Sequence, residues 1–515
     1  MSHLSTRLRR SVALLAALVL AGSMSVSGSA ADNAASRYLV VFDGTYALDG
    51  SYALGGDYAL NHQYALSIVE AAGGTVTNDL SKQIGVMIVE ASNADFYALL
   101  SSYALVDEVG RDWSWVGLPT YALGDVQGDN PDTSADALES LQWDMQMIRT
   151  EQAHAKQAGR PEVQVGVLDS GVDGHHVDFQ KGGAFNVDCA LGHDSLAVLP
   201  PGVAVGSPDP CVDNQFHGTH VAGTIAARAN GLGVTGVAPN VTLVPVKVCD
   251  ASGYCYASAV VDGITYAGDV KLEVVNMSFF VDDNAFQEST EFKCNSDPTQ
   301  RAFRRAVERA LQYARSQGVV PVAALGNSDQ DLSAAETESD DPTGVVGGTG
   351  GVFTEGGEPI DNSCEVVPAE SSGVIGTMAL GRNSQKASYS NYGVGAVDVA
   401  APGGAGTTGD CTTTILSTLP GDAYGCIQGT SMASPHAAGV AALIASQFGS
   451  LGSDGDWKME VTKVEALLQG TAVDIGLSGY DECFGHGRID ALRAVTKDTS
   501  SAYDASAPFC PEYGE

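Results

Sequence analysis

Positive charge is scarce in this chain, and that scarcity argues against two classes of partner. The 515 residues include 26 lysines and arginines against 62 aspartates and glutamates, so the formal net charge at pH 7 is −36. A surface of that sign repels the phosphates of nucleic acids and the headgroups of anionic membranes. We therefore expect neither nucleic acid nor an anionic membrane surface among its partners.

Long apolar runs are also missing, except at the N-terminus. There the run SVALLAALVLAG at 11–22 follows three arginines within residues 7–10 and precedes the small residues SGSAA at 27–31. The run is short for a membrane span, which needs about 20 apolar residues, and the three parts together match a secretory signal peptide. We expect export, with residues 1–31 removed and no membrane segment left; an uncleaved anchor helix is the alternative.

Cysteine pairs of the CxxC type are absent, so a structural zinc site is not expected. All ten cysteines follow the signal segment, and an even number in an exported protein predicts disulfides. The sequence leaves their connectivity open. Pairing neighbours along the chain gives one hypothesis: Cys189–Cys211, Cys249–Cys255, Cys294–Cys364, Cys411–Cys426 and Cys483–Cys510.

Residues 37–116 are predicted to form a small separate domain. The expected elements are a strand at 37–42, a helix at 62–74, strands at 76–79 and 85–91, a helix at 93–105 capped by Asn93, and a strand at 106–115. The order βαββαβ is typical of a ferredoxin-like α+β domain.

A tripeptide, YAL, recurs every six residues from 46 to 66 within this domain. A short period of this kind can indicate a β-helix. Only four copies run in series, however, and the last lies in the expected helix, as do later copies at 97–99 and 103–105. We interpret the repeat as an enlarged loop after the first strand rather than as a binding element.

Residues 117–140 are rich in Gly, Pro, Asp and Ser and are predicted to be an exposed linker. After it, six short apolar runs show no alternation, as expected of strands buried on both faces. They lie at 162–169, 241–248, 272–280, 318–325, 373–380 and 396–402. Helical segments separate several of them, so residues 141–497 are predicted to form an α/β domain with a mainly parallel sheet. Residues 498–515 form a tail without periodicity.

Three chemically active residues stand at the expected ends of these elements. Asp169 ends a buried strand, where ligands of an open parallel sheet gather. His217 begins a helix with the sequence HGTHVAGT, and Ser431 begins another with the sequence TSMASPHAAG. The two histidines of HGTH alone would also fit a zinc site or a helix core, and a lone Asp would fit a turn.

Together the three residues fit nucleophilic catalysis. A serine hydroxyl becomes a nucleophile when an imidazole takes its proton, and a carboxylate orients that imidazole. The amides at the start of the Ser431 helix can stabilise an oxyanion. Asn327, just after another buried strand, offers a second oxyanion donor.

The sequences around these residues resemble those of a known family. VLDSGVD at 167–173, HGTHVAGTIAA at 217–227 and GTSMASPHAAGVAALIA at 429–445 are similar to the three signature blocks of the subtilisin-like serine proteases. AALGNSD at 323–329 resembles that family's oxyanion block, with Leu325 where alanine is commoner, and FGHGRIDALRAV at 484–495 resembles the end of its catalytic domain.

The resemblance implies a subtilisin-like α/β fold, with a mainly parallel sheet flanked by helices and preceded by the small α+β prodomain. It implies a catalytic triad of Asp169, His217 and Ser431 with Asn327 as the oxyanion donor, while His220 is structural and neither histidine binds metal. It also implies an inhibitory prodomain at 32–116, cut from the catalytic domain within the linker.

The same resemblance gives the substrate-binding residues. Ser252 and Gly253 would pair with an extended substrate backbone, and Ser278, Phe279 and Phe280 would form the opposite strand and one wall of the specificity pocket. The two phenylalanines stand where the family usually has a smaller residue and a glycine, so we expect an altered pocket shape. No cofactor is implied for the chemistry; structural calcium is common in the family, but no ligand loop is mapped here.

The sequence therefore predicts a secreted serine endopeptidase, made as a zymogen, whose partners are polypeptide substrates and its own prodomain. One alternative is an esterase or amidase with the same triad, but the α/β-hydrolases carry GxSxG and the order Ser, Asp, His. The other is a catalytically inactive binding protein, which would be expected to lack at least one triad residue.

Overall fold

The computed structural model describes most of the chain after the expected signal segment. The described residues are 36–46, 52–53, 58–112, 114–118, 138–198, 206–279, 292–293, 298–333, 354–355, 358–359, 365–453, 455–508 and 510. All of them belong to one compact unit that begins at Ser36. The expected signal segment 1–31, most of the linker, Phe280 and the cysteines 294 and 364 lie outside these residues.

The N-terminal domain has the predicted βαββαβ order. Its elements are β1 (Ser36–Phe42), α1 (Tyr58–Ala71), β4 (Gly74–Leu80), α2 (Ser81–Ile84), β5 (Val86–Ala91), α3 (Phe96–Leu100) and β6 (Val106–Arg111). The four strands form one antiparallel sheet in the order β4-β5-β1-β6. This is the ferredoxin-like arrangement that the sequence indicates.

Several local predictions in this domain differ from the structure. Helix α3 ends at Leu100, so the YAL copy at 103–105 lies in a turn rather than in a helix. The side chain of Asn93 accepts a hydrogen bond from the amide of Asp95, but the N-cap position of α3 belongs to Asp95.

The YAL repeat itself divides between two kinds of structure. Its first copies contribute to the short strands β2 (Thr45–Tyr46) and β3 (Tyr52–Ala53), which pair with each other. Helix α1 begins at Tyr58, four residues earlier than expected, so the third and fourth copies are helical.

The predicted strand at 106–115 is two strands with different partners. Strand β6 ends at Arg111, and β7 (Ser114–Val116) leaves the sheet to pair antiparallel with β13 (Tyr254–Tyr256). The end of the N-terminal domain therefore becomes an added strand on the larger domain.

Both faces of the small sheet are covered. Successive side chains of a strand point to opposite faces, and in β1 Val40 and Phe42 pack with residues of α1 and α3. Leu39 and Val41 instead join the core cluster that contains α8 (Ala257–Asp269) and α9 (Pro298–Ser316). The sheet thus lies between its own helices and two helices of the larger domain.

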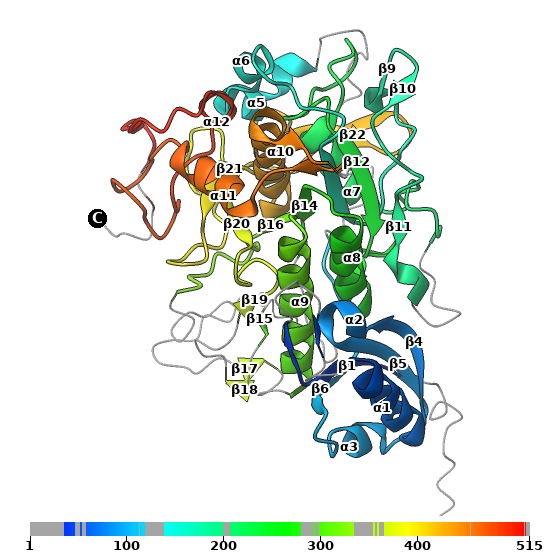
Figure 1. The fold of residues 1–515 in the computed structure, drawn as a ribbon. Coiled ribbons are helices and arrows are strands. Elements are labelled where there is room, and N and C mark those ends of the chain that lie inside the picture. The colour runs from blue at the N-terminus through cyan, green and yellow to red at the C-terminus, as the bar shows by residue number, and fades with distance from the viewer. Residues whose placement is uncertain are drawn as a thin grey trace, which may run out of the picture. The chain divides into compact units, whose positions relative to one another are not determined.

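The larger domain is built on a seven-stranded sheet (Figure 1). Its strands, in spatial order, are β11 (His193–Asp194), β12 (Thr242–Lys247), β8 (Gln164–Asp169), β14 (Val274–Met277), β16 (Val320–Ala324), β20 (Ile375–Leu380) and β21 (Val399–Pro402). All neighbouring pairs are parallel. Six strands match the predicted runs; β11, with two residues, was too short to predict.

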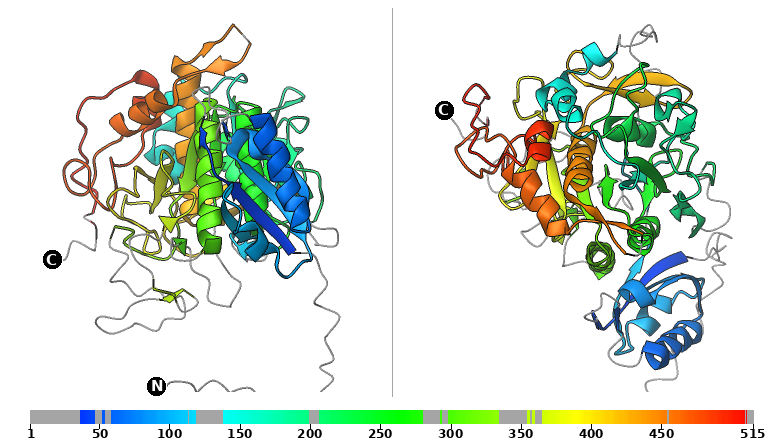
Figure 2. Two further views of the ribbon diagram at one scale, coloured as in Figure 1. Left: turned by 60° about the horizontal axis from the view of Figure 1, so that its bottom comes forward. Right: turned by 45° about the horizontal axis from the view of Figure 1, so that its top comes forward.

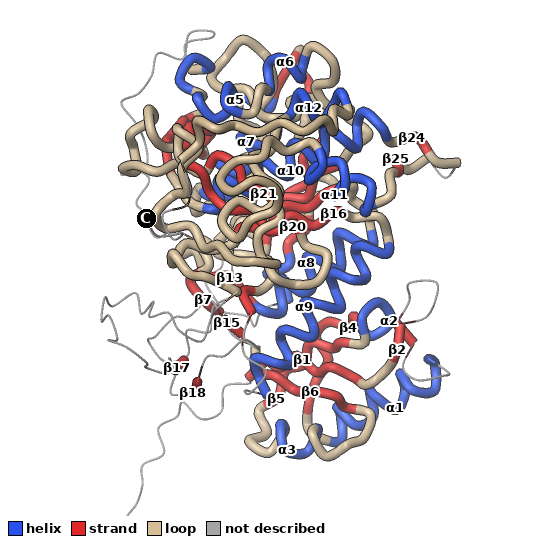
Figure 3. Tube along the Cα trace, turned by 90° about the vertical axis from the view of Figure 1, so that its left-hand side faces the viewer, coloured by secondary structure: helices blue, strands red, loops and turns tan. Residues whose placement is uncertain are grey.

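Helices cover both faces of this sheet, as Figure 3 shows. Helices α8 and α9 pack side by side on one face, where they are seen nearly end-on in the right-hand view of Figure 2. Helices α7 (His217–Ala226) and α10 (Thr430–Phe448) cover the other face. Strand β8 contributes to both layers, since Leu168 lies in one core cluster and Val167 in the other.

Shorter elements surround this framework. The helices are α5 (Trp143–Met147), α6 (Thr150–His154), α11 (Val461–Gly470) and α12 (Ala491–Thr496), with single 3₁₀ turns at Glu139–Leu141, Val177–Phe179 and Ser195–Val198. The paired strands are β9 (Gln180–Lys181) with β10 (Ala184–Phe185), β15 (Phe292–Lys293) with β19 (Glu365–Val366), β17 (Thr354–Glu355) with β18 (Glu358–Pro359), β22 (Ile415–Leu419) with β23 (Ala423–Ile427), and β24 (Ser450–Leu451) with β25 (Trp457–Lys458).

Four of the hypothesised disulfides are confirmed. They are Cys189–Cys211, Cys249–Cys255, Cys411–Cys426 and Cys483–Cys510, with Cα–Cα distances of 5.7, 4.0, 5.2 and 6.2 Å. The last of them fixes the C-terminal tail to the domain. Among the described helices, none is long and apolar enough to cross a membrane.

Candidate active site

The carboxyl end of β8 and the start of α7 bring Asp169 and His217 together. Both side chains are fully buried, and the Nδ1 atom of His217 lies 3.0 and 2.9 Å from the two carboxylate oxygens of Asp169. A carboxylate accepts, so Nδ1 carries the proton and donates it. The Nε2 atom of the same ring has no hydrogen-bond partner, which leaves a lone pair able to accept a proton.

A strained turn presents His217 to Asp169. Phe216, which precedes the helix, has φ of 119°, a value that side chains other than glycine rarely adopt. The carboxylate of Asp213 holds this turn by accepting the amides of Gln215 and Phe216 at 3.0 and 2.9 Å. After His217 the chain needs glycine, because a Cβ on Gly218 would collide with a backbone carbonyl of the loop after β8.

Ser431 lies in the first turn of α10, and its side chain is bonded to the neighbouring strand end. The helix begins at Thr430, and Ser431 is 6% exposed. Its Oγ donates to the carbonyl oxygen of Ser278 at 3.0 Å, and the Oγ of Ser278 donates to the carbonyl oxygen of Ser431 at 2.8 Å. Although α7 and α10 are in contact, Ser431 and His217 are not hydrogen-bonded to each other in this conformation.

A buried asparagine aligns the Ser431 turn with the sheet. The Nδ2 atom of Asn276 in β14 donates to Ser278 Oγ at 2.8 Å, and its Oδ1 accepts from Ser434 Oγ at 2.7 Å. All three groups are fully buried. Since buried polar groups are costly to leave unpaired, this chain of bonds fixes the register between β14 and the start of α10.

Asn327 lies beside the same helix start. Its Oδ1 accepts from the amide and the hydroxyl of Thr430 at 2.9 and 3.0 Å, which identifies that atom as the oxygen and directs Nδ2 elsewhere. A Cβ built on Gly429 would lie 3.6 Å from the amide nitrogen of Ser431 and 3.8 Å from Nδ2 of Asn327. The glycine therefore leaves a space that is bordered by these two N–H donors and, at 3.7 Å, by the Oδ1 atom of Asn327.

The expected cleft segment is occupied by the chain's own N-terminal part. Strand β7 pairs with β13, and the amides of Gly117 and Leu118 both donate to the carbonyl oxygen of Gly253, at 3.1 and 3.2 Å. The pairing continues along Tyr254–Tyr256 instead of including Ser252, because the amide of Ser252 bonds to Asp250 at 2.8 Å. The Cys249–Cys255 disulfide closes this loop.

The segment expected to form one wall of the specificity pocket is only partly described by the structure. Phe279 is the second residue after β14 and is fully buried, in the same core cluster as Leu118. Phe280, predicted to shape the same wall, lies outside the described residues.

The second histidine of HGTH has a different environment from the first. His220 is fully buried, and its Nε2 donates to the carbonyl oxygens of Ile415 and Gly425 at 3.0 and 3.2 Å. Burial lowers its pKa to about 3, so the ring is neutral. It joins α7 to the β22–β23 hairpin. No group of three or more His, Cys, Asp or Glu side chains among the described residues has the geometry of a metal site.

Sequence reasoning missed the supporting residues Asp213, Asn276 and the buried pair His436–Asp144. In that pair, His436 Nδ1 donates to the carbonyl oxygen of Met432 at 2.8 Å, while Nε2 lies 3.0 Å from Asp144. Asp213 had a usable signal, since an Asp just before a helix start often caps it. Asn276 and Asp144 had none, because each bonds to a residue of α10 more than 150 positions away in the chain.

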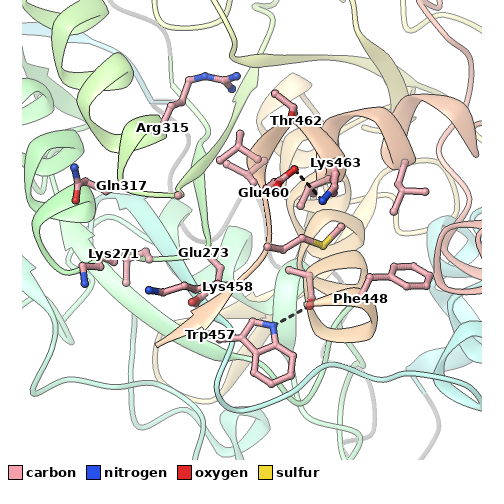
Figure 4. A pocket seen from close by; sticks show the side chains of 18 of the residues that line it. Lys271, Glu273, Arg315, Gln317, Phe448, Trp457, Lys458, Glu460, Thr462 and Lys463 are labelled. Atoms are coloured by element: carbon pink, nitrogen blue, oxygen red, sulfur yellow. Dashed lines mark hydrogen bonds and ion pairs between the residues drawn. The ribbon is translucent and has the colours of Figure 1, made fainter. Parts of the chain in front are cut away.

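A wide groove elsewhere on the domain does not coincide with these residues. It has a volume of about 1440 Å³ and is lined by the ends of α9 and α10, the β24–β25 hairpin and the start of α11. Figure 4 shows Glu273, Lys271 and Trp457 around it. Glu273 precedes β14 and Val320 begins β16, so the groove lies at the amino ends of the strands. Asp169 lies at the carboxyl edge, where an open parallel sheet binds its ligands.

A protein that carries a carboxylate–imidazole pair and a serine at the carboxyl edge of a parallel α/β sheet has the arrangement of a serine hydrolase. The family model of the subtilases, Peptidase_S8, matches residues 160–487. The chain therefore belongs to the subtilase family and is a serine-type endopeptidase.

Two relatives agree with that assignment, and one solved structure shares the fold. The chain is 32% identical over 359 residues to subtilisin NAT of Bacillus subtilis subsp. natto, covering 69% of this chain and 72% of that protein. It is 31% identical to subtilisin DY of Bacillus licheniformis, covering 69% and 99%. The crystal structure of an epidermin leader peptide processing serine protease from Staphylococcus aureus superposes with a TM-score of 0.66 at 19% identity, covering 91% of this chain and 100% of that one.

The matched part amounts to 91% of this chain, which is more residues than the range 138–515 contains. The shared fold therefore extends into the N-terminal domain. The family assignment and the fold predicted from the motifs are both confirmed.

Glu273, which lines this groove, gives a prediction of how the stability of the fold depends on pH. The carboxyl of Glu273 accepts the amide of Gln164 at 2.6 Å, and burial raises its pKa from 4.5 to about 8. Because the folded state binds this proton more tightly than the unfolded chain, folding loses stability as the pH rises from about 5 to about 8. Glu273→Gln keeps the acceptor and cannot ionise. The Tm of the variant relative to the parent should therefore increase between about pH 5 and pH 9.

The measurement is best made in a Ser431→Ala background, which we expect to prevent self-digestion. Glu460→Gln is the matched control, because its side chain lines the same groove and is 69% exposed. A Tm difference for Glu273→Gln that stays constant across this pH range would contradict the assigned burial effect.

Proposed function

We propose that this protein is a secreted serine endopeptidase, made as a zymogen, in which Asp169, His217 and Ser431 form the catalytic triad. The observation that carries the proposal is the buried Asp169–His217 pair, with Nδ1 held by the carboxylate and Nε2 without a partner. This is the tautomer that a general base for a serine hydroxyl requires. Helix α7, which carries the imidazole, contacts α10, which carries the hydroxyl.

In the proposed first step, Nε2 of His217 takes the proton from Ser431 Oγ as the oxygen attacks the carbonyl carbon of the substrate peptide bond. Asp169 stabilises the imidazolium that forms. Freeing Oγ costs only its bond to the Ser278 carbonyl, and catalytic hydrogen bonds often form only when substrate is bound. The imidazolium then protonates the leaving amine, and an acyl-enzyme results.

In the second step, His217 activates a water molecule that hydrolyses the acyl-enzyme and restores Ser431. Both steps pass through a tetrahedral oxyanion. The amide of Ser431 and Nδ2 of Asn327 border the space beside Gly429, so we assign the oxyanion to that space. No cofactor takes part in these steps.

We propose that residues 32–116 are an inhibitory prodomain. In support, Gly117 and Leu118 donate two backbone hydrogen bonds to Gly253, and β7 adds a strand to β13. Strand addition is how extended peptides bind to many proteins, so this segment mimics a bound substrate or product. Maturation cleavage then falls after Leu118, within the linker that ends at about Ser140.

Two further features support secretion and a proteolytic role. Four disulfides join described cysteines, and disulfides persist in oxidising compartments outside the cytosol. The partners in this proposal are polypeptide substrates and the chain's own prodomain. An esterase with the same triad is the less favoured candidate, because the serine is in GTSMA and the order is Asp, His, Ser.

Ser431→Ala should abolish peptidase activity. The expected loss is about a million-fold, the magnitude known from subtilisin, which is a relative of this chain. If maturation is autocatalytic, the same variant should stay as an uncut precursor, which electrophoresis and N-terminal sequencing of the secreted protein would show. A normally processed Ser431→Ala precursor would exclude self-cleavage.

Ser434→Ala is the matched control for that experiment, since it also removes a hydroxyl from the first turns of α10. It leaves Oδ1 of Asn276 without its 2.7 Å partner and should cost stability of about 1–3 kcal/mol. The nucleophile remains, so the variant should still react with a fluorophosphonate and clear casein.

Asn327→Asp tests the oxyanion assignment more sharply than removal of the side chain. Aspartate keeps an oxygen for Thr430 but replaces the Nδ2 donor with negative charge. We expect turnover to fall at least as far as in Asn327→Ala, by about 100- to 1000-fold, the magnitude known for the corresponding donor in subtilisin. KM should change little in either variant. If Asp restores the turnover that Ala loses, Asn327 acts only by supporting Thr430.

Two N-terminal fragments would test the strand-addition proposal. Residues 32–118 and residues 32–112 share all of β1–β6 and differ by the segment that pairs with Gly253 and β13. Added in trans to the mature enzyme, the longer fragment should inhibit at least about tenfold more strongly, because it alone makes those backbone hydrogen bonds. Circular dichroism would check that both fragments fold. Equal inhibition would contradict a role for β7 in the cleft.

A further inference from the structure

Helix α9 carries a row of arginines on the side that meets the N-terminal domain. Arg301, Arg305 and Arg309 are spaced four residues apart, which places them one above another on the helix surface. Their apolar neighbours Phe303, Val307 and Leu311 are buried in the core. The helix therefore presents an apolar face to the large sheet and a row of guanidinium groups to the N-terminal domain.

Two consecutive carboxylates of β6 bind this row. Arg301 forms a two-pronged contact with Glu108, with N–O distances of 2.6 and 3.2 Å. Arg305 and Arg309 both contact the carboxylate of Asp107, and Arg309 also donates to the carbonyl oxygen of Phe42 at 2.8 Å. Each arginine of the row thus contacts an acidic side chain of the N-terminal domain.

A β-bulge makes this double contact possible. Neighbouring residues of a regular strand point to opposite faces, yet Asp107 and Glu108 both contact α9. The register between β1 and β6 shifts at this position, because Val41 pairs with Glu108 and Phe42 pairs with Val106. Asp107 is therefore the extra residue of a bulge, which redirects side chains. The local backbone is shaped to offer two carboxylates to one helix.

The row is unusual for a chain of this charge. With 62 acidic and 26 basic residues, the enzyme as a whole repels acidic polypeptides. Arg304, on the same helix, contacts Glu308 and Glu365 of the catalytic domain instead, so the row's three arginines are the ones that face the N-terminal domain. Removing that domain takes Asp107 and Glu108 away from them.

We propose that the arginine row of α9 is a second binding surface of the mature protease, which holds an acidic segment of a polypeptide substrate where β6 lies in the precursor. The inference rests on the proposed function, because the surface is uncovered only when the prodomain is cut off and released. It names the substrate class: polypeptides that carry a cluster of Asp or Glu at a distance from the cleaved bond. Guanidinium groups suit this task because each can bind a carboxylate through two parallel hydrogen bonds.

The expected gain is in binding rather than in turnover. Exposed ion pairs are individually weak and sensitive to salt, but a tethered acidic segment raises the local concentration of the cleavable segment at the active site. We therefore expect an acidic segment to lower KM by about tenfold at low ionic strength, with kcat unchanged.

The experiment uses mature, self-processed enzyme and two peptides with the same cleavable sequence. A long Gly-Ser linker joins this sequence to six glutamates in one peptide and to six glutamines in the other. KM should be about tenfold lower for the glutamate peptide at about 0.05 M NaCl, and the difference should vanish at about 0.5 M. Equal KM values at low salt would overturn the proposal.

Variants then locate the effect. In Arg301→Gln/Arg305→Gln/Arg309→Gln the two peptides should have equal KM values, with the glutamine peptide cleaved as in the wild type. Arg304→Gln is the matched control and should keep the difference; loss of the preference in both variants would also overturn the assignment to the row.

If the triple variant fails to mature, the comparison shifts to wild-type enzyme. There, free hexaglutamate should raise KM for the glutamate peptide alone, and the absence of such competition would count against the row. Failure of mature enzyme to cleave either peptide would instead contradict the proposed function.

Discussion

The buried Asp169 carboxylate orients the buried imidazole of His217, and much of this domain is arranged around that pair. The amide of Ser170 also donates to Oδ1 of Asp169, at 2.8 Å, and helps to hold the carboxylate in place. Both oxygens of Asp169 lie within 3.0 Å of His217 Nδ1, in a site with no exposed surface on either side chain. Reaching that geometry requires a strand that ends at the aspartate and a helix that begins at the histidine. The strained turn at Phe216 and the close approach at Gly218 are the local costs, and the Asp213 carboxylate offsets the first of them.

The same constraint reaches the serine through the sheet. Strand β14 is hydrogen-bonded to β8, so the position of Asp169 sets the position of Asn276 and of Ser278. Those two residues are bonded to Ser434 and Ser431 in α10. Misplacing β14 would therefore misplace both partners of the proposed proton transfer together. The polar groups that make this connection are buried. They are bonded to one another because a buried polar group is costly when it is unpaired.

Much of the framework could be predicted from the sequence because its signals are local. Six buried strands, the starts of α7 and α10, and the βαββαβ order each follow from a run of neighbouring residues. The positions of Asp169, His217, Asn327 and Ser431 at element ends follow from the same runs. The supporting groups could not be predicted in this way, because Asn276 and Asp144 meet partners far along the chain. Nor does any local pattern show that β7 would leave its own sheet for β13, or that Ser252 would give its amide to Asp250.

The N-terminal domain is held by two kinds of interaction that respond differently to cleavage. One face of its sheet shares a core cluster with α8 and α9, while Asp107, Glu108 and Asp112 bind Arg301, Arg305, Arg309 and Ser258 at its rim. As long as the linker is intact, the domain and the cleft share one chain and the effective concentration of the bound strand is high. The cleavage proposed for the linker would remove that advantage without breaking a single one of these contacts. The apolar face then sets how tightly the domain is retained, whereas the ion pairs set how strongly its release depends on salt. A protein with so few cations can tune that second property with three arginines on one helix.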